Sequence, residues 1–251
     1  MNSGIPFHAF GPAHLVVIAL TIALPFCLNA ISRGSKSQSF DRIVRGALAM
    51  LLICTYVGYA LYQNRAGTLR WAEALPFQLC DWTMFAVVAA LLRAGRRAWL
   101  EVAYFWGIGG SLQAIVTPNL QFGFPDIRFL SFFADHCAIV IGIVYLMLSR
   151  EFRPTLNSVW RTLAWSEFYF VVTLLVDWIT GVNYGFLLHK PEAFSILNYL
   201  SNSWPLYILQ MHGLAYAFFA ILYAPFAIFD LAQGKSQPRK IAGRLCETPS
   251  K

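Results

Sequence analysis

The stretch Leu75–Trp82, LPFQLCDW, opens an apolar run that continues to Leu92 and is long enough to cross a membrane. Yet positions 78–81 include an amide, a thiol and a carboxylate. Polar and ionisable groups inside a membrane segment cost free energy, so each marks a candidate functional site. Pro76 suits the first position of a helix. This predicts that Cys80 lies about one turn into the helix, where the helix dipole favours a thiolate.

The composition of the whole chain is that of a membrane protein. Of its 251 residues, 58% are hydrophobic and only 12% are charged, whereas soluble domains carry about a quarter charged residues. Apolar runs recur at spacings that suit helices of roughly 20 residues. The sequence predicts an all-α, polytopic membrane protein with a bundle of seven transmembrane helices. The predicted spans are Ala13–Ile31, Ile43–Tyr62, Pro76–Leu92, Ala98–Thr117, Phe129–Ser149, Val159–Thr180 and Leu206–Phe229.

The basic residues predict the orientation of this bundle. Of the 19 Lys and Arg residues, 15 fall on one side of the predicted spans and four on the other. The positive-inside rule then predicts that the chain lies in the cell (cytoplasmic) membrane with its N-terminus outside and its C-terminus in the cytoplasm. Residues 1–232 form one transmembrane domain, and 233–251 form a basic tail that we expect to be disordered. The basic residues in the loops between the predicted spans and in the tail account for the net charge of +7. We therefore expect membrane lipids as partners and no nucleic acid.

With this orientation, most intramembrane polar groups fall in the outer half of the bundle, on six of the seven helices. Cys80 and His136 lie on different predicted helices and are the candidate catalytic pair. Gln78, Asp81, Asp135 and His14 are candidate supporting groups. A further set is predicted to line an outward-facing cavity: Gln113, Asn119, Asp177, Asn183, Gln210 and His212. The alternative is that interfacial depth simply tolerates polar residues near helix ends.

A thiol and an imidazole together permit nucleophilic acyl chemistry. The thiolate attacks an acyl carbonyl, while histidine serves as base and then as acid. Asp135 or Asp81 would orient the imidazole as the third member of a triad does. An ionised Asp81 would oppose thiolate formation at Cys80, and an inert buried thiol is the simpler interpretation. A non-catalytic transporter or ligand sensor is the alternative function.

The sequence predicts neither a cofactor nor a metal site. Its five cysteines form no CxxC motif and show no metal-type spacing. A site made of His14, Cys80, His136 and His212 would suit copper or zinc, but their spacing does not support one. The small-residue run Gly107–Ser111 follows no strand, so it indicates close helix packing rather than phosphate binding.

Seven segments, in this order, carry a resemblance to a known family. They are Phe10–His14, Leu75–Cys80, Tyr104–Ala114, Thr117–Leu120, Phe133–His136, Asn183–Leu187 and Trp204–Leu209. Over nearly its whole length the chain resembles the YwaF-like integral membrane proteins of bacteria.

This family looks like the one that contains an animal transmembrane acyltransferase acting on ether phospholipids. The resemblance implies a lipid acyltransferase or acyl-ester hydrolase, with Cys80 as nucleophile and His136 as its partner. The family commonly has histidine where this chain has Gln78, and an amide cannot act as a base.

Overall fold

The computed structural model describes residues 5–35, 37–92, 97–149, 152–192 and 195–233. It is helical, as predicted, and within these ranges the only β contact is an isolated bridge between Pro6 and Phe122. The predicted tail beyond residue 233 lies outside the described residues. The elements are α1 (Pro12–Ser35), α2 (Gln38–Arg65), α3 (Leu79–Leu91), α4 (Arg97–Trp106), the π-helical turn η1 (Gly107–Ser111), α5 (Leu112–Val116), α6 (Ile127–Leu148), α7 (Leu156–Thr180), the 3-10 turns η2 (Tyr184–Phe186) and η3 (Ile196–Tyr199), and α8 (Trp204–Ala232).

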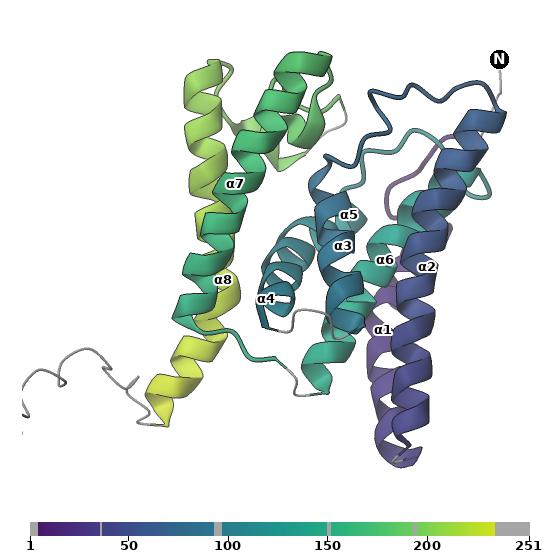
Figure 1. Cartoon of the computed structure of the whole chain (residues 1–251), viewed down its shortest axis with the longest axis vertical. Coiled ribbons are helices and arrows are strands. Elements are labelled where there is room, and N and C mark those ends of the chain that lie inside the picture. The colour runs from purple at the N-terminus through teal and green to yellow at the C-terminus, as the bar shows by residue number, and fades with distance from the viewer. Residues whose placement is uncertain (1–4, 36, 93–96, 150–151, 193–194, 234–251) are drawn as a thin grey trace, which may run out of the picture.

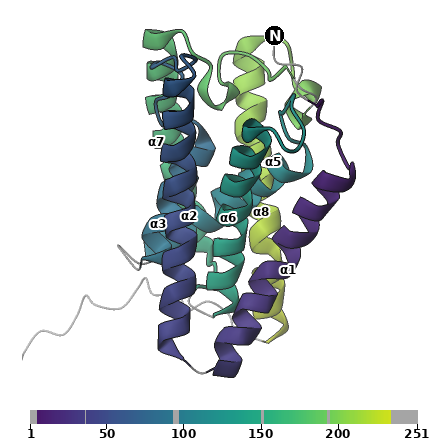
Figure 2. The same ribbon diagram turned by 90° about the vertical axis from the view of Figure 1, so that its right-hand side faces the viewer.

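The chain reverses direction at every connection of a long helical bundle (Figures 1 and 2). One end of the bundle carries the N-terminus and the α2–α3, α5–α6 and α7–α8 connections. We call it the N-terminal end. The α1–α2, α3–α4 and α6–α7 connections and the last residues of α8 lie at the opposite end. Among the described residues, five helices are long and apolar enough to cross a membrane: α1, α2, α6, α7 and α8. The shorter α3 has 13 residues, while α4, η1 and α5 run from residue 97 to 116 without a break.

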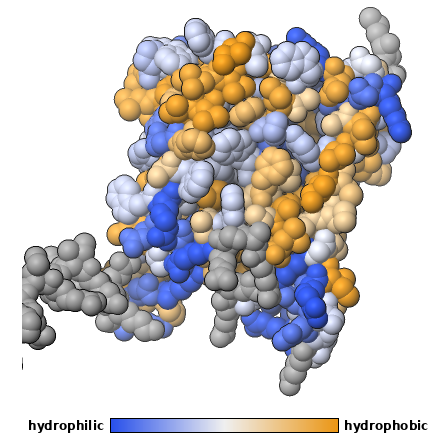
Figure 3. All heavy atoms as spheres, in the orientation of Figure 1, coloured by the Kyte–Doolittle hydropathy of each residue, from blue (hydrophilic) through white to orange (hydrophobic). Residues whose placement is uncertain are grey.

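The buried core lies between α2, α3, α4 and α6, where Leu52, Val87, Phe105 and Ile139 are fully buried. By contrast, α1, α7 and α8 turn large apolar side chains outward, and Trp178 of α7 is 82% exposed. Figure 3 shows broad hydrophobic areas on the side of the bundle and hydrophilic residues concentrated towards its lower end. An apolar outer surface of this kind is what a lipid-facing bundle requires.

The glycine run in the middle of the bundle allows the close packing that the sequence predicts. A Cβ on Gly107 would clash with Cδ1 of Ile143 on α6, so no larger residue fits without a shift. At this point the helix widens to the π-helical turn η1, which contacts α3, α6 and α8. A single π turn inside an α-helix leaves part of the usual backbone hydrogen-bond ladder rearranged.

A buried carboxylate ties α4 to α7 near the opposite end of the bundle. Glu101 is 1% exposed and accepts hydrogen bonds from Arg97 Nε at 2.9 Å, Ser158 Oγ at 2.8 Å and Arg161 Nε at 2.7 Å. Its charge is therefore both paired and hydrogen-bonded, as a buried charge must be. We call Glu101, Arg97, Ser158 and Arg161 the Glu101 cluster.

Candidate functional site

The sequence predicts a helix that begins at Pro76, and this prediction is wrong: α3 begins three residues later, at Leu79. The backbone of Gln78 is extended, with ψ of 147°, and its N–H donates to Asp81 Oδ2 at 3.0 Å. The carbonyl of Pro76 accepts from the indole of Trp82 at 2.9 Å instead of starting the helix. Cys80 is therefore the second residue of α3, in its first turn.

The residues before α3 are held by α7 and by the loop that follows it. Tyr169 of α7 donates from its hydroxyl to the carbonyl of Phe77 at 2.9 Å. Gln78 Oε1 accepts from the backbone N–H of Gly185 at 3.1 Å. Tyr184 donates to the carbonyl of Ala72. Three contacts that are remote in sequence therefore fix the backbone that presents Cys80.

Cys80 is partly buried and lies among acidic and phenolic groups from three helices. Its thiol interacts electrostatically with Asp81 on the same helix and with Asp135 of α6. Tyr169 of α7 interacts electrostatically with both Cys80 and Asp81. We call Cys80, Asp81, Asp135 and Tyr169 the Cys80 cluster. Three of its four members were predicted from the sequence, whereas Tyr169 was not.

The Cys80 cluster contains an unpaired acceptor. Oδ1 of Asp135 is buried and has no hydrogen-bond partner among the described residues. A buried polar atom without a partner costs about 1–3 kcal/mol. A ligand that donates a hydrogen bond would recover that free energy, so the cluster offers a place for a polar group.

His136 follows Asp135 on α6 and has a fixed orientation. Its Nδ1 lies 2.8 Å from the carbonyl oxygen of Phe132, and its ring stacks on the Phe132 ring at 4.2 Å between centroids. Because a carbonyl only accepts, Nδ1 carries the hydrogen and Nε2 of the neutral ring carries the lone pair. No described residue donates to that Nε2. Asp135 Oδ2 lies 3.8 Å from Nδ1, beyond hydrogen-bond distance.

Among the described contacts, neither a hydrogen bond nor an electrostatic interaction joins Cys80 directly to His136. Asp135 is the residue that connects them, because it acts on Cys80 and precedes His136. The helices themselves are neighbours: α3 packs against α6, where a Cβ on Gly142 would lie 3.2 Å from Val87.

His14, predicted as a supporting residue, is held by backbone groups away from the Cys80 cluster. Its Nδ1 accepts from the N–H of Phe10 at 2.9 Å, and its Nε2 lies 2.7 Å from the carbonyl of Ile115. The ring is 1% exposed. Both nitrogens are thus used, and His14 joins the start of α1 to α5.

The residues predicted to line a cavity are distributed over separate places. Asp177, fully buried on α7, accepts from Tyr184 N at 2.8 Å. Asn183 accepts from Leu188 N at 2.8 Å and so shapes the α7–α8 loop. Gln210 accepts from Ser201 N at 2.6 Å. Gln113 is partly buried, Asn119 is exposed, and His212 contacts Glu167.

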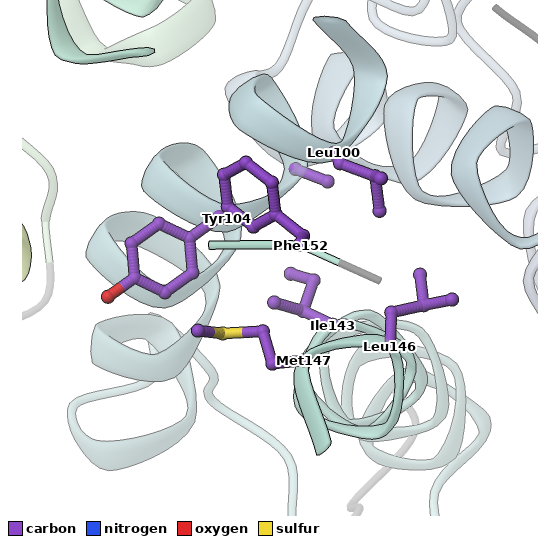
Figure 4. Close-up of a pocket in the computed structure, with 7 residues that line it drawn as sticks. Leu100, Tyr104, Ile143, Leu146, Met147 and Phe152 are labelled. Atoms are coloured by element: carbon purple, nitrogen blue, oxygen red, sulfur yellow. The ribbon is translucent and has the colours of Figure 1, made fainter. Parts of the chain in front are cut away.

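The acidic, histidine and cysteine side chains do not converge as metal ligands in the part of the chain that the structure describes. A small pocket between α4 and α6 is of a different kind, because it is lined only by apolar and aromatic residues (Figure 4). Its lining is Leu100, Ala103, Tyr104, Ile143, Leu146, Met147 and Phe152. The Tyr104 hydroxyl donates to the carbonyl of Leu222 at 2.9 Å, so this pocket offers no reactive group.

Fold and surface together define a multi-pass, helical membrane protein. Comparison with known families agrees: the TMEM164 family matches residues 9–223. The chain belongs to the TMEM164 family. No curated protein and no solved structure matches it.

Proposed function

We propose that the chain crosses the cytoplasmic membrane seven times, with its N-terminus outside and its C-terminus in the cytoplasm. The five long helices would be joined by α3 with its lead-in and by the continuous run α4–η1–α5. The distribution of basic residues supports this orientation. Those described at the opposite end are Arg33, Arg42, Arg45, Arg97, Arg153 and Arg161, against Arg65, Arg70, Arg128 and Lys190 at the N-terminal end. A closer relation to the YwaF-like bacterial proteins within the family stays a prediction.

We further propose that the protein transfers or hydrolyses acyl groups on a membrane lipid, with Cys80 as nucleophile and His136 as general acid and base. The observation that carries this proposal is the imidazole of His136. Its Nδ1 is occupied by the Phe132 carbonyl, so the basic Nε2 is the free atom. The neighbouring helix α3 carries the Cys80 thiol in its first turn. A backbone carbonyl thereby does the orienting work that an aspartate does in a serine-protease triad.

The reaction would run in two steps. First, Nε2 of His136 takes the Cys80 proton as Sγ attacks the ester carbonyl. The S–C bond forms, the C–O bond breaks, and the departing alkoxide receives the proton from His136. Next, a lipid hydroxyl or water gives its proton to His136 and attacks the thioester. The new ester or acid forms, and the leaving thiolate of Cys80 regains the proton.

The acidic neighbours of Cys80 bear on how the thiol is activated. Carboxylates of Asp81 and Asp135 near the sulfur disfavour a resting thiolate. Proton removal by His136 as attack occurs therefore fits this site better than a preformed thiolate. The substrate must bring the two groups together, because the described contacts do not already join them.

The test is acylation of purified protein in lipid nanodiscs by phospholipids with alkyne-tagged acyl chains. Wild type should gain a label that hydroxylamine removes, as a thioester requires. Cys80→Ala should lose it, whereas Cys54→Ala, which removes an exposed thiol on α2, should keep it. His136→Gln should slow labelling by about 10²–10⁴-fold. Equal labelling of wild type and Cys80→Ala would refute the nucleophile.

A second candidate function is non-covalent binding of a small polar solute, as in a transporter or sensor. The buried and unpartnered Oδ1 of Asp135 favours it, because a bound donor would satisfy that atom. Cys80 and Asp81 lie in the first turn of α3, at its end nearer the N-terminal end of the bundle, which suits a one-sided binding pocket better than an alternating-access path. Cys80→Ser separates the candidates: solute binding tolerates a hydroxyl there, while thioester chemistry fails.

A further inference from the structure

A second cluster of polar side chains lies between α7 and α8, apart from the Cys80 cluster. Nε2 of His212 is 3.2 Å from Oε2 of Glu167, and the hydroxyl of Tyr216 donates to Oε1 of Glu167 at 2.8 Å. The rings of Phe170 and His212 form a T-shaped pair, with the centroids 4.7 Å apart. In the described part of the chain no contact links Glu167 or His212 with any member of the Cys80 cluster.

These groups lie deep in their helices. Glu167 is eleven residues from the start of α7 and thirteen from its end, which places it roughly 16 Å and 20 Å from the two ends at 1.5 Å per residue. Its side chain is 44% exposed on a bundle whose outer surface is apolar. An ionised carboxylate facing hydrocarbon is costly and needs a partner or a proton.

The hydrogen-bond geometry fixes how many protons the pair holds. Nδ1 of His212 lies 2.8 Å from the carbonyl of Ile208, and because a carbonyl only accepts, Nδ1 carries a hydrogen. In the neutral ring Nε2 then bears a lone pair, as Oε2 of an ionised Glu167 does. Two lone pairs do not attract, so the 3.2 Å contact requires one proton between them. Imidazolium with carboxylate, and neutral imidazole with carboxylic acid, have the same proton count and the same zero net charge.

We propose that Glu167 and His212 form an intramembrane site that binds one shared proton and by it joins α7 to α8. Tyr216 supports the site by donating to the other carboxylate oxygen. Among the described residues, Tyr216 is the one further titratable side chain that contacts either member, and it comes from α8. Loss of the proton would leave a net negative charge within the membrane and set the Nε2 lone pair against the carboxylate.

Glu167→Gln gives a variant in which an amide N–H, which does not dissociate, takes the place of the shared proton. Its amide N–H donates to Nε2 of His212, and its carbonyl oxygen accepts from Tyr216. Wild type and this variant are unfolded in nanodiscs over a range from about pH 5 to about pH 10, which brackets ordinary histidine titration. The unfolding constant of wild type, divided by that of the variant, should rise with pH by up to tenfold per pH unit, the limit for one proton.

Two further measurements keep this test independent of folding losses. Tyr216→Phe removes one hydrogen bond and leaves the proton, so it should keep the wild-type pH dependence. Nitrogen NMR of labelled histidine, with the His212 signal assigned from His212→Gln, should show hydrogen on Nδ1 at every pH. A ratio of unfolding constants that is constant with pH, or an alkaline form with a bare Nδ1 and hydrogen on Nε2, would overturn the proposal. Both measurements can be made on Cys80→Ala and thus do not depend on acyl transfer.

Discussion

Replacing Glu101 by glutamine should destabilise the protein more than any comparable change at an exposed ion pair. The variant keeps the shape of the side chain and an oxygen acceptor for Ser158, whose side chain is fully buried. It loses the charge that holds Arg97 and Arg161. The contacts of Glu101 with Ser158 and Arg161 link α4 to α7, and Trp106 of α4 also donates from Nε1 to Ser166 Oγ of α7 at 2.8 Å.

The size of the effect follows from the exposure of the partners. Hydrogen bonds to charged groups contribute about 1.5–3 kcal/mol each. The side chains of Arg97 and Arg161 are 56% and 49% exposed, so water takes up part of what they lose. We therefore expect a loss of about 2 kcal/mol for Glu101→Gln. Glu101→Ala, which also leaves a cavity, should cost about 3–4 kcal/mol.

The assay is thermal unfolding of purified protein in lipid nanodiscs. For a chain of this length, 1 kcal/mol corresponds to roughly 2–4 °C, so Glu101→Gln should lower Tm by about 4–8 °C. The matched control is Glu73→Gln at the exposed Arg70–Glu73 pair, where the side chains are 77% and 50% exposed and the loss should stay below about 1 kcal/mol. Equal shifts for both variants would refute the stabilising role of the Glu101 cluster.

Three other changes give distinct expectations. The guanidinium of Arg128 hydrogen-bonds Asp126 and lowers the pKa of this carboxyl to about 2; the resulting stability is present above the ordinary value of 3.8 and is lost as the pH falls towards 2. Acid unfolding curves should flatten for Asp126→Asn, which keeps the acceptor for the N–H of Arg128, and a curve identical to wild type would exclude this contribution. Gly107→Ala should cost about 1–3 kcal/mol by overpacking against Ile143, and Ile143→Ala in the same chain should recover part of it; in thermal unfolding, additive losses would show that the methyl group meets something else. Tyr169→Phe should cost about 1 kcal/mol and loosen the start of α3, which hydrogen exchange at Cys80 and Asp81 would report as faster exchange; unchanged exchange would contradict the anchoring role of the hydroxyl.

The helices could largely be predicted from the sequence, because long apolar runs separated by polar turns leave little choice in a membrane protein. Each predicted span falls on a helix or a continuous helical run. The predicted start of α3 at Pro76 was wrong, because the preference of proline for the first helical position is only a local one. Remote groups outweighed it: Tyr169 binds the carbonyl of Phe77, and Gly185 binds the side chain of Gln78.

The candidate site was harder to predict, because position along a helix is readable from sequence and the direction in which a side chain faces is not. Cys80, Asp81 and Asp135 interact with one another. His14 is instead turned to the backbone of Phe10 and Ile115. The sequence carries a local signal for part of the Glu101 cluster, the i,i+4 spacing of Arg97 and Glu101. It carries no such signal for the contacts of Glu101 with α7.

The amide of Gln78 serves two helices at once. It belongs to the residue that precedes α3, and it also anchors the loop between α7 and α8 through Gly185. A histidine at this position could accept the same hydrogen bond through one ring nitrogen, so the loop between α7 and α8 would keep its anchor if an imidazole replaced the amide. Such an exchange would add a titratable group just before α3 without removing the contact that holds the loop.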